Sequence, residues 1–296
     1  MLGACSGSNA SPPDSKRAIV LIHGSWFGSW CFSPLIPLLA AKGITAIAPD
    51  LPGHGLGAQF PASFSVRPLD QAAFATEPSP LANVTLADYA AVVVQAVNGL
   101  AAAGFSAITV LGHSMGGIPI TVAAEMLPGS IAKLIYLSAF MPVTGLPAGA
   151  YFGTPQGMEN QLAPLFLADQ NTVGALRLDT GSTDALYIAA MKSAFCADVS
   201  DTVFPAMRHL MTPDDPAQPF GTPTGATVGR WGSIKRAYIG CTQDNAVTPD
   251  LQQLFISEAD KMTPQQLTEF HAFASSHSPF VSKPQQLADL IATIAA

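Results

Sequence analysis

Short apolar runs constrain the fold of this chain more than any other feature. The chain has four early runs rich in Val, Ile and Leu: Ala18–Ile22, Ile44–Ala48, Ala107–Leu111 and Lys133–Ala139. Such strands suit a parallel sheet that helices cover on both faces. Helical segments are predicted between the runs, over residues 34–42, 85–103 and 117–127. The β-α-β-α-β-α-β order therefore predicts a mainly parallel α/β sheet.

The alternation stops after the fourth run and resumes near the carboxyl end. Residues 141–232 contain many Pro, Gly and Thr residues and several short helical stretches. The pattern then continues with a strand, a helix, a strand and a helix over Arg236–Cys241, Pro249–Ala259, Leu267–Phe273 and Pro284–Ala295. We predict one domain over residues 16–296, with a cap inserted at about 141–232. Residues 56–84 show no period and are predicted to form a long surface excursion.

Composition excludes several classes of function. The 296 residues are 49% hydrophobic, which is enough for a packed core, and the formal net charge is −7. An acidic chain lacks the basic footprint that nucleic-acid binding needs. The longest apolar run, around Ala90–Ala103, is too short to cross a bilayer, so no transmembrane span is predicted. Cys31, Cys196 and Cys241 form no CxxC pair, which disfavours a metal site; we expect buried thiols and leave a disulfide among them open.

The amino-terminal residues 1–15 are predicted to form a flexible segment. Leu2-Gly3-Ala4-Cys5 resembles a bacterial lipoprotein box, and the Ser- and Pro-rich stretch after it resembles a tether. The charged and apolar regions of a signal peptide do not precede Cys5. Two interpretations stay open. In one, a shortened precursor carries a lipid anchor on Cys5 at the cell envelope or in the periplasm; in the other, a cytoplasmic or secreted chain matches by chance.

A nucleophile signature lies between a predicted strand and a predicted helix. Gly112-His113-Ser114-Met115-Gly116 fits the pattern G-x-S-x-G. In that context the sharp turn exposes the serine hydroxyl at the carboxyl end of the strand, and glycines are needed because side chains would clash. The amino-terminus of the following helix favours negative charge at the same place. Ser114 is therefore the predicted catalytic nucleophile.

At this point the chain resembles the α/β-hydrolase superfamily over residues 16–296. Within it, the chain is similar to the branch of plant methyl-ester esterases and hydroxynitrile lyases. The residues that carry the resemblance are His23-Gly24-Ser25-Trp26, Asp50–Gly55, Gly112–Gly117, Cys241-Thr242-Gln243-Asp244 and His277-Ser278-Pro279-Phe280. The resemblance implies an α/β-hydrolase fold, a catalytic triad and an oxyanion hole, and it implies no cofactor or metal ion.

A serine nucleophile needs a base and an acid that orients the base. In this fold the base follows the last strand, where His277 lies; His271 falls within the strand pattern, and His113 is expected to point away from the site. By the chain order Ser…Asp…His, the acid is Asp244, directly after the strand that ends at Cys241. We expect Asp250 and Asp260, in or after the next helix, to be solvated.

The resemblance also implies which residues form the oxyanion hole, and it suggests candidates for the substrate pocket. Backbone N–H groups of Met115 and Ser25 are expected to bind the developing oxyanion. Gly24, Trp26 and Phe27 are the candidate substrate-pocket residues, with core packing as the alternative for the aromatic ones. The other histidines are expected to be structural, with His23 and His54 in loops near the site and His209 in the cap.

The predicted function is hydrolysis of small to medium neutral esters by a serine carboxylesterase through an acyl-serine intermediate. A lactonase or thioesterase could use the same triad. A hydroxynitrile-lyase-like carbon–carbon lyase is disfavoured because such lyases carry a lysine after the catalytic histidine, where this chain has Ser278, and a threonine where it has Gly24. A non-catalytic ligand-binding member of the fold is the remaining alternative. The sequence leaves the oligomeric state open.

Overall fold

A six-stranded parallel sheet is the centre of the fold. The computed structural model describes residues 16–143 and 145–295. The strand order is β2-β1-β3-β4-β7-β8, and every neighbouring pair runs parallel. The strands are β1 Arg17–Ile22, β2 Thr45–Ile47, β3 Ala107–His113, β4 Lys133–Leu137, β7 Lys235–Cys241 and β8 Glu269–Phe273. The predicted mainly parallel sheet is confirmed.

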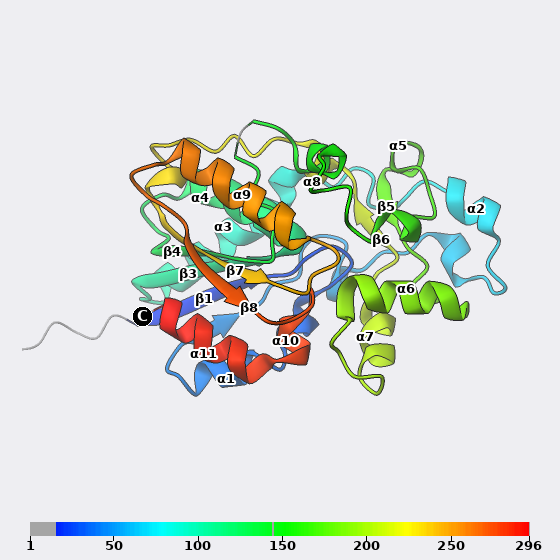
Figure 1. The fold of residues 1–296 in the computed structure, drawn as a ribbon, viewed down its shortest axis with the longest axis horizontal. Coiled ribbons are helices and arrows are strands. Elements are labelled where there is room, and N and C mark those ends of the chain that lie inside the picture. The colour runs from blue at the N-terminus through cyan, green and yellow to red at the C-terminus, as the bar shows by residue number, and fades with distance from the viewer. Residues whose placement is uncertain (1–15, 144, 296) are drawn as a thin grey trace, which may run out of the picture.

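Helices cover both faces of this sheet (Figure 1). Two helices pack together on one face, α1 (Ile36–Ala40) and α11 (Pro284–Ile294). Three helices lie on the other face, α3 (Leu86–Ala102), α4 (Gly117–Met126) and α9 (Pro249–Met262). Buried residues recur in α3 about every three or four positions, which is the spacing of an apolar helix face. The layers therefore enclose a core on each side of the sheet.

The start of α3 shows how local sequence signals set an element boundary. The Thr85 hydroxyl accepts from the backbone N–H of Asp88 at 3.2 Å, and the Asp88 carboxylate accepts from the backbone N–H of Thr85 at 2.9 Å. This reciprocal pair is a capping box, which satisfies two N–H groups that a helix start leaves without partners. The helix start predicted from these residues is confirmed.

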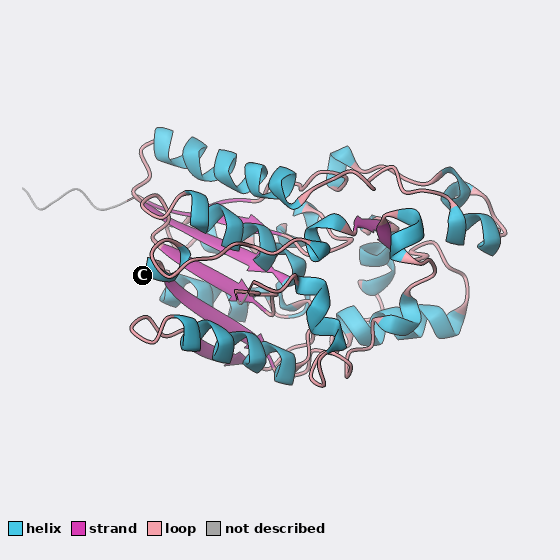
Figure 2. Cartoon of the chain, turned by 90° about the horizontal axis from the view of Figure 1, so that it is seen from above, coloured by secondary structure: helices cyan, strands magenta, loops and turns pink. Residues whose placement is uncertain are grey.

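Residues 141–232 connect β4 to β7, which are neighbours in the sheet. Most of this 141–232 segment lies beyond the carboxyl ends of the strands, and its last residues run back beside α4 to the start of β7 (Figure 1 and Figure 2). It contains α5 Gln170–Val173, α6 Ala185–Cys196, α7 Phe204–Leu210, α8 Gln218–Gly221 and the antiparallel pair of β5 Ala175–Arg177 and β6 Asp214–Pro216. The small sheet was not predicted, because strands of three residues are too short to show a period.

The surface excursion at 56–84 is more ordered than its sequence predicts. It contains a 3-10 turn at Ala62–Ser65 and α2 at Gln71–Thr76. Arg177 of β5 ties it to the 141–232 segment by donating to the carbonyl oxygens of Phe74 and Glu77. The same guanidinium makes two hydrogen bonds to Asp214, at 2.7 and 2.8 Å, and both side chains are fully buried.

Cys31, Cys196 and Cys241 are buried free thiols. Within residues 16–143 and 145–295, no helix combines the length and the apolar character needed to cross a bilayer. The predicted flexible segment and the lipid-anchor hypothesis at Cys5 fall on residues 1–15, outside the described residues.

Candidate active site

Ser114 lies at a sharp turn between β3 and α4. β3 ends at His113, a 3-10 turn covers Ser114–Gly116, and α4 begins at Gly117. Ser114 has a φ of +54°, which non-glycine residues rarely adopt. A Cβ atom on Gly116 would lie 2.6 Å from the carbonyl oxygen of His23, so a larger residue would clash with the end of β1. The turn holds the Ser114 side chain at the carboxyl edge of the sheet.

Residues with a strained backbone conformation cluster at the carboxyl edge of the sheet. In the described chain, the non-glycine residues with positive φ are Trp26, Ser114 and Ser138, at +62°, +54° and +42°. They follow β1, β3 and β4, which are consecutive strands in the sheet. Strained residues persist where their surroundings hold them, and they cluster at functional sites. The strain therefore marks the same place as the G-x-S-x-G signature.

His277 and Asp244 form a buried hydrogen-bonded pair at the same edge. The loop after β8 carries His277, and the loop after β7 carries Asp244. The Nδ1 atom of His277 lies 2.6 Å from Oδ2 of Asp244. The other carboxylate oxygen, Oδ1, accepts from the backbone N–H groups of Ala246 and Val247 at 2.7 and 3.0 Å. With its Nδ1–H directed at the carboxylate, the imidazole keeps Nε2 free to accept a proton.

His113 supports the loop that carries His277. Its Nε2–H donates to the carbonyl oxygen of His277 at 2.8 Å, and the two rings lie 4.5 Å apart. The expectation that His113 points away from the site is therefore corrected: its ring packs against the imidazole of the predicted base. Burial, with His277 beside it, lowers the pKa of His113 well below the ordinary value, so the ring stays uncharged.

The loop after β1 lies directly against Ser114. A Cβ atom on Gly24 would lie 2.7 Å from the Cβ of Ser114. His23 fixes this loop: its Nδ1–H donates to the carbonyl oxygen of Gly24 at 2.9 Å, and its Nε2 accepts from the N–H of Leu51 at 3.0 Å. Burial, reinforced by His54, lowers the pKa of His23 to about 3. His23 is thus a neutral support, as its loop position suggested.

The two residues expected to bind an oxyanion are sequence neighbours of Gly24 and of Ser114, which lie against each other. Ser25 follows Gly24 and is buried, and its hydroxyl has no hydrogen-bond partner among the described residues. Met115 is the second residue of the turn at Ser114–Gly116, where N–H groups lack partners inside the helix. Ser114 itself is almost buried, and its hydroxyl makes no hydrogen bond within residues 16–143 and 145–295.

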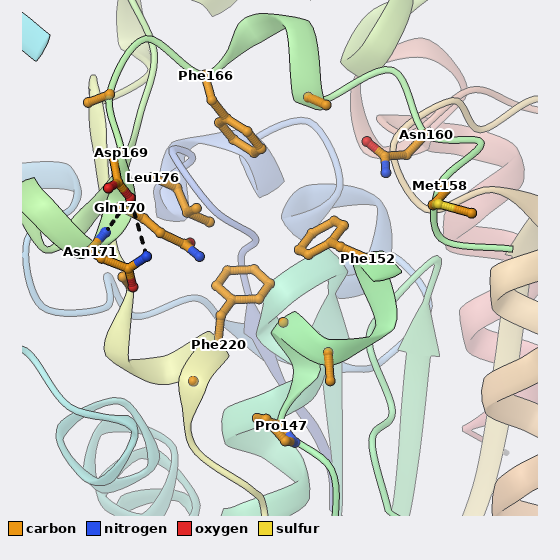
Figure 3. Close-up of a pocket in the computed structure, with 16 residues that line it drawn as sticks. Pro147, Phe152, Met158, Asn160, Phe166, Asp169, Gln170, Asn171, Leu176 and Phe220 are labelled. Atoms are coloured by element: carbon orange, nitrogen blue, oxygen red, sulfur yellow. Dashed lines mark hydrogen bonds between the residues drawn. The ribbon is translucent and has the colours of Figure 1, made fainter. Parts of the chain in front are cut away.

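A cavity of about 900 Å³ lies within the 141–232 segment (Figure 3). Phe152, Phe166, Leu176 and Phe220 point toward its centre, and Asp169, Gln170 and Asn171 lie at one side. The full lining is Pro147, Gly149, Ala150, Phe152, Met158, Asn160, Ala163, Phe166, Ala168, Asp169, Gln170, Asn171, Leu176, Ala217, Phe220 and Gly221. It is therefore mainly apolar, and its single charged residue is acidic.

Two aromatic residues connect this cavity to the strand ends. Phe140 packs against Phe152 and Phe220 with ring centroids 5.6 and 5.4 Å apart, and its backbone N–H donates to the carbonyl oxygen of Ser114 at 2.9 Å. Trp26 lies 6.2 Å from the ring of Phe166, and its indole N–H donates to the carbonyl oxygen of Leu176 at 2.9 Å. The cavity wall is therefore in contact with the residues that surround Ser114.

None of the three candidate pocket residues from the sequence is among the lining residues of this cavity. Gly24 contacts Ser114, and Trp26 packs behind the cavity wall. Phe27 is 1% exposed and packs edge-on against His113 and Phe280. Leu176 and Phe220 are among the lining residues that sequence reasoning missed. They lie on β5 and α8, which are too short for any pattern to reveal their direction.

The remaining histidines lie outside the Ser114 turn and the His277–Asp244 pair. His54 is fully buried, and its Nε2 lies 3.1 Å from Oδ1 of Asp215, so it joins the loop after β2 to β6. His271 contacts Glu269 at 2.8 Å at the sheet edge, and His209 is exposed on α7. Asp260, expected to be solvated, has a partly exposed side chain that also accepts from the backbone N–H of Thr268.

Known proteins with this fold identify the class. Residues 19–290 match the model of the alpha/beta hydrolase family. Methylesterase 9 of Arabidopsis thaliana is 26% identical over 93% of this chain and 97% of its own, and esterase PIR7B of Oryza sativa subsp. japonica is 27% identical over 95% and 96%. A pyrethroid hydrolase from Sphingobium faniae JZ-2 has a TM-score of 0.72 and 26% identity, covering 94% of this chain and 97% of that one.

The chain therefore belongs to the alpha/beta hydrolase family, which confirms the fold predicted from its motifs. The relatives named above are a methylesterase, an esterase and a pyrethroid hydrolase, which agrees with the resemblance to the methyl-ester esterases.

Proposed function

We propose that this protein is a serine carboxylesterase in which Ser114 is the nucleophile, His277 the general base and Asp244 the acid. The observation that carries the proposal is the buried 2.6 Å contact between His277 and Asp244, at the sheet edge where the strained Ser114 turn also lies. A strained serine at a strand-to-helix turn and a carboxylate-bound imidazole are the two parts that acyl transfer requires.

The reaction follows from these positions. Binding of an ester closes the hydrogen bond between Ser114 and His277, since such bonds are often loose without substrate. The Ser114 oxygen attacks the carbonyl carbon, its proton passes to Nε2 of His277, and Asp244 stabilises the imidazolium. Backbone N–H groups of Ser25 and Met115 bind the oxyanion. The alcohol leaves with the proton from His277, and water activated by the same ring then releases the acid.

The cavity supports a neutral, largely apolar substrate. Its volume of about 900 Å³ lies near the upper end of small-molecule sites, which span about 300–1,000 Å³. Because its lining has no basic residue and includes Asp169, an anionic substrate would be repelled. We propose that the 141–232 segment acts as a cap, and that its cavity holds the acyl or alcohol part of a medium-sized ester.

The lyase alternative lacks support at Ser278. The lyases of this branch carry a lysine there, whereas the Ser278 hydroxyl of this chain donates to the carbonyl oxygen of Phe195 at 2.8 Å and is fully buried. A buried neutral hydroxyl provides no cation for a cyanide leaving group. Ester hydrolysis needs no such cation, which favours it here.

The proposal is tested with p-nitrophenyl acetate, butyrate and octanoate. Ser114→Ala and His277→Ala should each lower kcat by roughly 10⁴–10⁶. A fluorophosphonate should label the wild-type chain on Ser114, as peptide mass spectrometry can show, and should leave Ser114→Ala unlabelled. Serine-independent turnover, or labelling at another residue, would refute the assignment.

A further inference from the structure

Ser138 occupies a position that the triad alone does not explain. It follows β4 directly, is fully buried, and has a φ of +42°. Its backbone N–H donates to the carbonyl oxygen of Ile239 on β7 at 2.9 Å, so the strained backbone is held in the sheet. A non-glycine residue in this conformation needs a compensating interaction.

The Ser138 hydroxyl both accepts and donates a hydrogen bond within the protein. The side-chain amide of Gln252 donates to Ser138 Oγ at 3.0 Å, and it also donates to the carbonyl oxygens of Val247 and Cys241. A carboxylate oxygen accepts, so the Ser138 proton is directed at Oδ2 of Asp244, and Oγ can accept from Gln252. The same Oδ2 accepts from Nδ1 of His277.

We propose that Ser138 is a positioning residue for the reaction, whose hydroxyl shares one carboxylate oxygen of Asp244 with His277. This inference rests on the proposed function, because it presupposes that His277 is the base. The Ser138 hydroxyl would do two things. It fixes the rotation of the carboxylate together with Ala246 and Val247, and it withdraws negative charge from the oxygen that faces the imidazole.

The second effect determines how tightly His277 holds a proton. A carboxylate that loses a hydrogen-bond donor becomes a stronger partner for an imidazolium. Removing the Ser138 hydroxyl should therefore keep His277 protonated at higher pH, and a protonated imidazole cannot act as a base. The acid limb of kcat/KM would move to higher pH, whereas a purely structural role would lower activity without moving the limb.

Other titratable groups around His277 and Asp244 are not expected to produce the same shift of the acid limb. Burial raises the pKa of Tyr238 and of Cys241 and lowers that of His113, so these three neighbours stay uncharged. Asp198 accepts from Ser275 and Ser276 on the loop of His277, and it lies 3.8 Å from Lys283. The Cys241 thiol also interacts with the Ser138 hydroxyl, which lowers its pKa, so losing that hydroxyl would keep the thiol uncharged.

The test uses two substitutions at Ser138 with a Ser114-dependent ester assay. Ser138→Ala and Ser138→Gly both remove the hydroxyl, but glycine also relieves the positive φ. Both should raise the pH of half-maximal kcat/KM by about half to one unit and lower kcat about tenfold. Thr121→Val is a matched control. It removes a buried hydroxyl bonded to Tyr136 on β4, and it should leave the pH profile unchanged.

The outcomes separate the inference from the function on which it rests. If the two Ser138 variants keep the wild-type pH profile, the inference is overturned while Ser114→Ala still defines the esterase. If Ser138→Ala shifts the profile and Ser138→Gly does not, the backbone conformation matters and the hydroxyl does not. If Ser114→Ala retains full turnover, the proposed function itself fails. The downfield proton resonance of His277 Nδ1–H gives a readout without turnover: it should shift in both Ser138 variants.

Discussion

Acid should destabilise this fold through two histidines that are buried without charge. Burial lowers the pKa of His23 to about 3 and that of His113 well below its ordinary value. A histidine in an unfolded chain titrates near 6.5. Between pH 6.5 and about 3, the unfolded chain therefore binds more protons than the folded chain. The free energy of unfolding must fall as the pH is lowered through this window.

The size of the effect follows from the number of protons. Each histidine that stays neutral when folded removes about 1.4 kcal/mol per pH unit below 6.5. At pH 4.5 the two histidines together remove about 5 kcal/mol, which equals the lower end of typical domain stability. Carboxylates with lowered pKa, such as Asp50, Glu125 and Asp198, lose their contribution only below about pH 4.5. The window from 6.5 to 4.5 therefore reports on the histidines.

Urea unfolding at several pH values between 7.0 and 4.5 measures this slope. His113→Asn should reduce the slope by about half, to roughly 1.4 kcal/mol per pH unit, whatever it does to the stability at pH 7. A wild-type slope near zero in this window would show that the buried rings are protonated in the folded state or that the site opens locally. A slope unchanged in His113→Asn would exclude His113 as one of the two groups.

Three further substitutions have definite expected outcomes. Asp244→Asn presents an amide to the Nδ1–H of His277, so kcat should fall by about 10³–10⁴ in the p-nitrophenyl butyrate assay; near-wild-type turnover would place the acid elsewhere. Asp214→Ala leaves Arg177 buried without its carboxylate, so urea unfolding should show a loss of about 3–5 kcal/mol, and equal stability would contradict this account. Phe220→Ala enlarges the cavity and should raise the kcat/KM ratio of octanoate to butyrate roughly threefold to tenfold; an unchanged ratio would place the acyl chain elsewhere.

The sheet was predictable because its central strands β1, β3 and β4 are mainly apolar and buried on both faces. Ala18–Ile22 and Ala107–Leu111 fall within β1 and β3, and the ends differ by one or two residues. The capping box at Thr85 located α3 in the same way, since a cap is a local chemical signal. The β5–β6 pair escaped prediction because its pairing joins residues about 40 positions apart and each strand has three residues.

In the candidate site, too, residues with a local sequence signal were predicted, and residues that depend on tertiary contacts were not. Ser114, His277 and Asp244 were selected by a local turn signature and by chain order, and the structure brings His277 and Asp244 into contact. Ser138 gave no signal, because a serine at the end of a strand is common and its hydrogen bonds to Asp244 and Gln252 depend on the tertiary fold. Cavity walls such as Phe220 also depend on long-range packing, which sequence periodicity does not record.

The way the 141–232 segment joins the sheet bears on how such an enzyme could change its substrate. The segment leaves the sheet at the end of β4 and returns at β7, and these two strands pair directly, from Lys133 with Lys235 to Leu137 with Ile239. The lining residues of the cavity all lie within the segment, whereas Ser114, Asp244 and His277 are carried by strand ends outside it. An exchange of this one stretch of chain would therefore replace the proposed substrate surface and leave the proposed triad attached to the same sheet.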